Sequence, residues 1–120
     1  QMSSEPVIDP VELFRLLGEP TRLAVVMLLT RHSELCVCDL MSALDVPQSR
    51  ISRHLGILRA GGLLADERRG QWVYYRLAVA ADSPEHSLLL GIGERYQSFV
   101  QPFANRLTEC IEPDCCGGPA

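Results

Sequence analysis

Two cysteines separated by one residue, Cys36 and Cys38, stand beside Asp39 at the start of a short amphipathic segment. Thiolates bind soft metals and metalloids and are also oxidised to disulfides, so the pair indicates soft-ion binding or redox chemistry. The chain carries five cysteines, and an odd number disfavours a disulfide framework. Reduced thiols are typical of the cytoplasm, which is the compartment that we expect. An alternative for either cysteine alone is a small apolar core residue.

The position of this pair suits a switch. Cys38 falls in the first turn of an expected helix over 38–44, where unpaired N–H groups and the helix dipole favour a thiolate. Side chains two residues apart on a regular helix diverge by about 200°. The two thiols can therefore hold one ion only if Cys36 precedes the helix or the helix start unwinds, and binding would reshape this helix end.

Arginines form a second group of functional side chains. Residues 47–76 hold six arginines against two carboxylates, although the whole chain has a net charge of −4. All 11 cationic side chains are arginine. A basic island on an acidic body fits a polyanion such as nucleic acid, and the alternative is a solvated surface with chance clustering.

Hydrophobic periodicity and turn residues predict the elements that position these groups. The predicted helices are 10–17, 20–32, 38–44, 48–60 and a long helix 84–107 with a kink near Pro102. Strands 63–67 and 72–77 around Gly70 form a β-hairpin. The predicted fold is mainly α with a small β-hairpin (α+β): a winged helix-turn-helix of about five helices and a two-stranded wing.

The helix-turn-helix predicts the residues that meet double-stranded DNA. If Ile51, Leu55 and Leu58 face the core, the start of the second helix faces outward. Arginine can read guanine and glutamine can read adenine. The candidate DNA-binding residues are Gln48, Ser49, Arg50, Ser52, Arg53 and His54 on this helix and Arg68 and Arg69 at the hairpin tip. Packing on a neighbouring helix is the alternative for His54, and a solvated turn is the alternative for the two wing arginines.

The chain divides into three expected segments: an N-terminal tail 1–9, a DNA-binding and dimerisation domain 10–108, and a flexible cysteine-containing tail 109–120. One module makes few phosphate contacts, so we expect a homodimer that uses the apolar stripes of the first and last helices. No apolar run approaches the roughly 20 residues of a membrane span, and the first ten residues lack the pattern of a signal peptide.

Three stretches, ELCVCDL, SRISRHLGILRAGGLL and RRGQWVYYRL, closely resemble the ArsR/SmtB family of winged-helix metal-sensing repressors, and within it the arsenite-responsive branch. The resemblance covers roughly residues 10–80. It implies a homodimer that represses an arsenic-resistance operon and leaves operator DNA when As(III) or Sb(III) binds as inducer. It also implies that the protein is no enzyme and has no permanent cofactor.

The resemblance assigns the metalloid ligands only in part. Cys36 and Cys38 match the first two thiol ligands, but Met41 stands where that branch carries a third cysteine, and a thioether binds As(III) poorly. Cys110, Cys115 and Cys116 of the tail are the candidate third ligands. The alternative is a two-sulfur site with hydroxide or an added thiol, which would also suit a methylated arsenical.

Other functions remain as alternatives. A thiol redox switch would use the same cysteines on the same fold. A Zn/Cd-type sensor would need His and Asp pairs on the last helix, where the sequence offers only Asp82 and His86. A phosphatase-like or arsenate-reductase enzyme needs an arginine six residues after its cysteine, and neither Cys36 nor Cys38 has one. A DNA-binding module without an effector is the last alternative.

Overall fold

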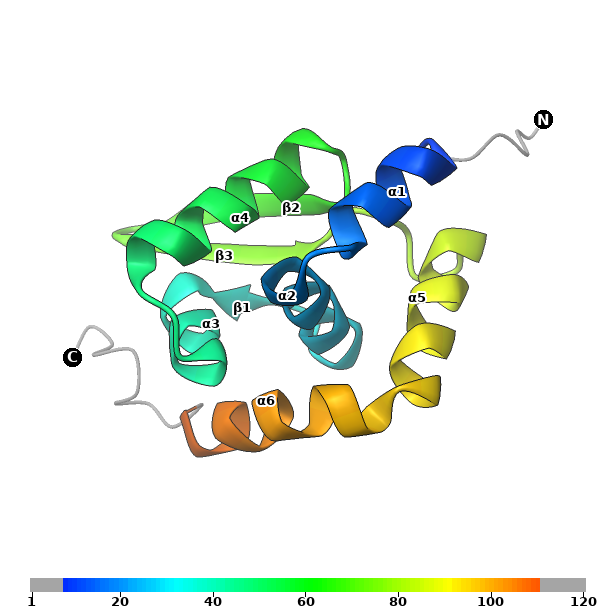
Figure 1. Ribbon diagram of the computed structural model, residues 1–120. Helices are drawn as coiled ribbons and strands as arrows, with labels where there is room; N and C mark the ends of the chain where they lie inside the picture. Colours follow the sequence, from blue (N-terminus) through cyan, green and yellow to red (C-terminus); the bar gives the residue numbers. More distant parts are fainter. Residues whose placement is uncertain (1–7, 111–120) are drawn as a thin grey trace.

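The computed structural model describes residues 8–110, with side chains to residue 107. This part of the chain contains six helices and three strands (Figure 1). In chain order they are α1 (Pro10–Leu17), α2 (Pro20–Arg31), β1 (Leu35–Cys36), α3 (Val37–Leu44), α4 (Gln48–Ala60), β2 (Leu64–Arg69), β3 (Trp72–Leu77), α5 (Pro84–Arg95) and α6 (Gln97–Cys110). The predicted tails fall largely outside the described residues, and their boundaries stay predictions.

Helix α2 is the centre of the core. Its six consecutive residues 24–29 are all buried, because a helix that is apolar around its whole circumference needs packing partners on every side. Five other helices and strand β3 contact it (Figure 1). Pro20 occupies its first turn, and the Glu19 carboxylate accepts a hydrogen bond from the backbone N–H of Arg22 (3.0 Å).

Helices α3 and α4 form the predicted helix-turn-helix. Asp45, with φ +57°, ends α3 in the left-handed region and turns the chain towards α4. The predicted inward residues Ile51, Leu55 and Leu58 are fully buried. Helix α4 ends where Gly61 approaches α1 so closely that an added Cβ would lie 2.7 Å from a methyl of Leu16.

The sheet has three antiparallel strands in the order β1-β3-β2, one more than predicted. Gly70, with φ +63°, lies in the two-residue turn of the wing. Strand β1 pairs Cys36 with Tyr74 of β3, so the wing is joined directly to the cysteine segment. Sequence analysis missed β1 because two residues carry no periodic signal.

The single long C-terminal helix was a wrong prediction. The chain breaks at Tyr96 (φ −115°, ψ 45°), whereas Pro102 lies inside α6. Figure 1 shows α5 turning away from α6, which runs below α2 and α3. Helix α5 packs on α2, whereas α6 packs on both α2 and α3. Within the described residues, no helix is long and apolar enough to cross a bilayer.

Candidate nucleic-acid interface and cysteine site

The N-terminal half of α4 presents the predicted DNA-reading side chains. Gln48, Ser49, Arg50, Ser52 and Arg53 are all exposed. Neither of the two arginines makes an ion pair with any residue in the described part of the chain. Their guanidinium groups are therefore available to an external anion.

His54 is buried at the edge of the inward face of α4, and the structure therefore places it differently from a DNA contact. Its side chain is 4% exposed, and its Nδ1 lies 3.2 Å from a guanidinium nitrogen of Arg22. Because guanidinium only donates, Nδ1 accepts and the imidazole is neutral in this arrangement. Burial lowers the pKa of His54, with Glu19 (3.8 Å from Nε2) opposing and nearby arginines reinforcing the shift. We withdraw His54 from the candidate DNA contacts.

Arg22 supports this face of the recognition helix, and sequence analysis did not single it out. Its Nε donates to the carbonyl of Leu16 (2.8 Å), and a second nitrogen donates to the carbonyl of Arg15 (3.3 Å). Arg22 thus satisfies two terminal carbonyls of α1 while it contacts His54 of α4. The contact with His54 joins residues 32 positions apart, so no local sequence pattern predicts it.

The two wing arginines, Arg68 and Arg69, differ in their side-chain contacts. Arg69 donates to both carboxylate oxygens of Glu34 (2.6 and 2.7 Å) and to Glu67 (3.0 Å), and it lies 4.4 Å from the Tyr74 ring centre. These contacts lower the pKa values of both carboxyl groups and raise the pKa of Arg69. The side chain of Arg68 is exposed, and among the described residues it bonds only to the carbonyl of Gly70 (3.4 Å). We therefore keep Arg68 alone as the candidate wing contact.

The cysteines occupy the junction between β1 and α3. Cys36 is the N-cap of α3, with extended backbone angles (φ −84°, ψ 164°), and its side chain is 4% exposed. Its N–H donates to the Asp39 carboxylate (3.3 Å), as in a capping box. Cys38 is half-buried in the first turn. Cys36 therefore precedes the helix, which is one of the two geometries compatible with a shared ion.

Cys36 and Cys38 are the only cysteines whose side chains the structure describes. Helix α6 ends at Cys110, whose side chain is not described, and Cys115 and Cys116 lie outside the described residues. Among the described side chains, which include Asp82 and His86, no three His, Cys, Asp or Glu residues gather closely enough to hold a metal ion. The choice between a tail cysteine and a non-protein third ligand stays open.

A cavity of about 310 Å³ adjoins the exposed side of Cys38. Three elements and the wing turn contribute its walls, which are Val37, Cys38, Met41, Gln48, Gln71, Trp72 and Val73. Sequence analysis did not foresee it, because α3 and β3 are distant in the chain. The indole Nε1 of Trp72 is buried and has no hydrogen-bond partner among the described residues.

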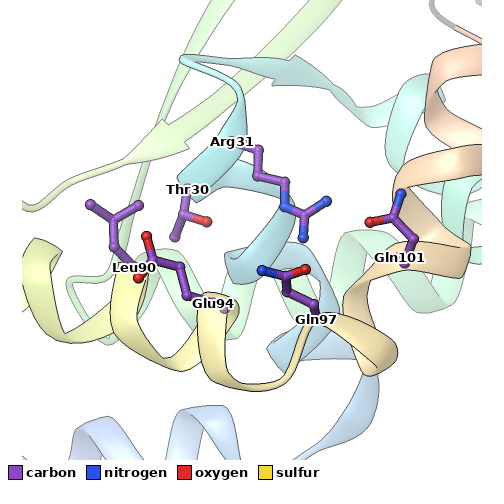
Figure 2. A pocket seen from close by; sticks show the side chains of 7 residues that line it. Thr30, Arg31, Leu90, Glu94, Gln97 and Gln101 are labelled. Atoms are coloured by element: carbon purple, nitrogen blue, oxygen red, sulfur yellow. The ribbon is translucent and has the colours of Figure 1, made fainter.

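A second cavity, of about 400 Å³, lies between the end of α2 and the α5–α6 junction. Figure 2 shows Arg31 reaching towards Gln97 and Gln101, with Glu94 and Leu90 on the other side. None of the predicted DNA-binding or cysteine residues lines this cavity. It is therefore separate from the two sites described above.

An exposed arginine-bearing recognition helix beside a β-hairpin wing defines a DNA-binding regulator of the winged helix-turn-helix class. A family model described as "Bacterial regulatory protein, arsR family" matches residues 19–66. The chain is 42% identical over 106 residues to the arsenic resistance transcriptional regulator ArsR1 of Pseudomonas putida, covering 88% of this chain and 83% of the relative. The chain belongs to the ArsR family, a family of regulators and not of enzymes.

Further relatives agree with this class. The arsenical resistance operon repressor of Escherichia coli K12 is 55% identical over 69 residues, which is 58% of this chain and 59% of the relative. The solved structure of HlyU from Vibrio cholerae superposes with a TM-score of 0.65 at 31% identity, over 72% of this chain and 90% of that one. The solved structure of the transcriptional repressor BigR from Xylella fastidiosa superposes with a TM-score of 0.62 at 27% identity, over 72% of this chain and 84% of that one. These matches confirm the predicted winged-helix fold.

Proposed function

We propose that this protein represses an arsenic-resistance operon as a DNA-bound homodimer in the cytoplasm and releases the operator when As(III) or Sb(III) binds Cys36 and Cys38. One observation carries the proposal: Cys36 is at once the N-cap of α3, which packs on α4, and the partner of Tyr74 in the wing. Relatives named as arsenic-resistance regulators support the choice of inducer.

In the repressing state, α4 lies in the major groove with its N-terminal residues towards the bases. Arg50 and Arg53 contact guanine or phosphate, and Gln48, Ser49 and Ser52 supply shorter donors and acceptors. Arg68 of the wing contacts the adjacent backbone. Each phosphate contact makes binding weaker as the salt concentration rises.

The exposed apolar faces of α1 and α5 support the homodimer. Val11 is 76% exposed, Phe14 58% and Leu88 44%. A cavity of about 220 Å³ between α1 and α5 is lined by residues of both helices, among them Phe14 and Leu88. Two copies joined here would present two recognition helices to half-sites about 34–36 Å apart. Phe14→Glu should therefore yield monomers in light scattering, whereas a dimeric variant would contradict this interface.

The switch begins when both thiolates take one ion. Since Cys36 is extended and Cys38 helical, sharing an ion pulls the N-cap towards the first turn. Strand β1 follows through its pairing with β3, and α3 shifts against α4. Coupling of this kind is typically about 1–3 kcal/mol, or 5- to 150-fold in affinity, and operator DNA weakens As(III) binding by the same factor.

The third arsenic ligand is either a tail thiol or a non-protein group. Cys110 is the last residue of α6, and Cys115 and Cys116 come after it in the sequence. Arg106 of α6 donates to the Ala43 carbonyl (2.7 Å) near the C-terminal end of α3. The packing of α6 on α3 supports a tail thiol as the third ligand. Hydroxide or a small thiol serves the two-cysteine alternative.

An operator-release titration tests the function. A duplex selected by the protein from a random-sequence pool is labelled, and its fluorescence anisotropy is followed as As(III) is added. Release should require Cys36 and Cys38, and single Cys→Ser variants at all five positions identify the third ligand. Unchanged operator affinity at saturating As(III) would refute the inducer. Release by peroxide with a new disulfide in mass spectra, and none by As(III), would establish the redox alternative.

A further inference from the structure

We propose that the cavity beside Cys38 is a subsite for the carbon substituent of a trivalent monoorganoarsenical, so that the protein binds arylarsenicals in preference to inorganic arsenite. The proposal rests on the proposed function, because Cys36 and Cys38 must hold the arsenic atom. It adds a substrate class and names the residues that select it.

The cavity has the size and lining that an aryl group needs. Met41 lies one helical turn after Cys38 on the same face of α3, and Trp72 and Val73 of β3 line the cavity from the wing. An apolar cavity of about 150 Å³ is enough to bind benzene. The volume of about 310 Å³ at Cys38 therefore admits a phenyl ring, and a thioether, an indole and an isopropyl group provide apolar walls beside the two glutamines that also line the cavity.

The chemistry of arsenic explains why the missing thiol matters. In R–As(OH)2 the arsenic keeps its As–C bond, and only two positions need thiolates. Two As–O bonds break, two As–S bonds to Cys36 and Cys38 form, and the two hydroxyl groups leave as water with the two thiol protons. The arsenic stays trivalent throughout. Met41 at the third position is then suitable, because the substituent and not a sulfur fills that side.

The location of the cavity also gives the substituent access to the DNA-reading elements. Gln48, the first residue of α4, and Gln71, in the wing turn, both line it. A ring bound there contacts the recognition helix and the wing together. We therefore expect an arylarsenical to release operator DNA at lower concentration than arsenite does.

Tryptophan fluorescence gives a direct readout, because Trp72 is the sole tryptophan of the chain. Phenylarsine oxide, which hydrates to the dihydroxy form, should change the emission with a one-to-one endpoint in the full-length protein. Arsenite should bind at least about tenfold more weakly, since filling an apolar subsite is worth about one to two orders of magnitude. Cys38→Ser should abolish both responses.

Variants at Val73 test the cavity itself. Val73→Phe fills it and should weaken phenylarsine oxide binding by about tenfold or more while changing arsenite binding less than about threefold. Val73→Ala, the matched control at the same position, leaves the space open and keeps the preference. Gln71→Phe repeats the filling from an exposed turn, where the fold tolerates it, and circular dichroism checks that each variant is folded.

Met41→Cys tests the two-sulfur chemistry independently. A third thiolate one turn from Cys38 should strengthen arsenite binding and remove the preference for the aryl compound, whereas Met41→Leu should keep it. If arsenite releases the operator through Cys36 and Cys38 but neither filled variant alters the ratio of the two affinities, the subsite is refuted and the repressor function stands. If neither arsenical binds the two cysteines, the proposed function itself fails.

Discussion

The arginines of the recognition helix and those of the wing look equivalent in the sequence but differ in the folded protein. Arg50 and Arg53 project from α4 without an ion pair to any described residue. Arg69 of β2 is held by Glu34 and Glu67. A paired arginine must give up its carboxylates before it can meet a phosphate, and an unpaired one need not.

The difference separates two tasks within one basic island. The α4 arginines are available for DNA, while Arg69 ties the wing to the segment that carries Cys36. Glu34 lies two residues before Cys36. The Arg69–Glu34 ion pair and the β1–β3 pairing therefore both connect the wing to the segment around β1.

Arg53→Ala should cause the largest change. A bidentate arginine contact is worth about 1–3 kcal/mol, so operator affinity should fall by about tenfold or more, and the change occurs twice in a dimer. Anisotropy titrations at several salt concentrations measure it. Arg31→Ala, on the end of α2 away from α4, is the control. Equal losses in both variants would mean that only net charge matters.

Arg68→Ala and Arg69→Ala should separate the two wing arginines. We expect Arg68→Ala to weaken binding about three- to tenfold through a lost phosphate contact and to reduce the salt slope by about one per subunit. Arg69→Ala should change affinity less than about twofold, because that side chain already has carboxylate partners. If the Arg69 variant loses as much operator affinity as the Arg68 variant, the proposed difference between the two wing arginines is wrong.

Glu34→Gln should release Arg69 and have a smaller, opposite effect. An added free cation near the wing tip should strengthen non-specific DNA binding about two- to threefold at low salt, and the gain should vanish at high salt. Glu94→Gln makes the same charge change on α5 as a control. An unchanged salt dependence would show that Arg69 stays bound to Glu67.

The smallest effect concerns the inward face of α4. The pKa of His54 is lowered on folding, so the unfolded chain takes up a proton near pH 6.5 while the folded protein does not. Stability is unaffected above that pH, falls as the pH drops below about 6.5, and levels off below the folded pKa. Thermal unfolding measured at several pH values should show no such loss of stability at low pH for His54→Gln, whereas His32→Gln should still show it. If His54→Gln still lost stability at low pH, a group other than His54 would cause the pH dependence.

Much of the architecture was predictable because it depends on local patterns. Apolar spacing located the inward residues Ile51, Leu55 and Leu58, and Gly70 located the wing turn. The same reasoning joined α5 and α6, because helical propensity continues through Tyr96. In the structure the chain breaks there between α5, which packs on α2, and α6, which packs on both α2 and α3.

In the candidate site, too, some features were predictable from the sequence and others were not. The residues of the cysteine pair and of the outward face of α4 were predictable, because the chemistry belongs to the residue types and the spacing assigns the face. The burial of His54, its contact with Arg22 and the cavity against Trp72 were not, since each joins segments distant in the chain.

Residue identity thus established the class of protein, the DNA-reading helix and the two thiols that stand beside it. Tertiary structure alone decided which arginines keep their charge available, which histidine is buried, and what surrounds Cys38. The physical reason is that propensity and periodicity act over one or two turns of chain. Ion pairing, desolvation and cavity shape depend on neighbours that only folding brings together.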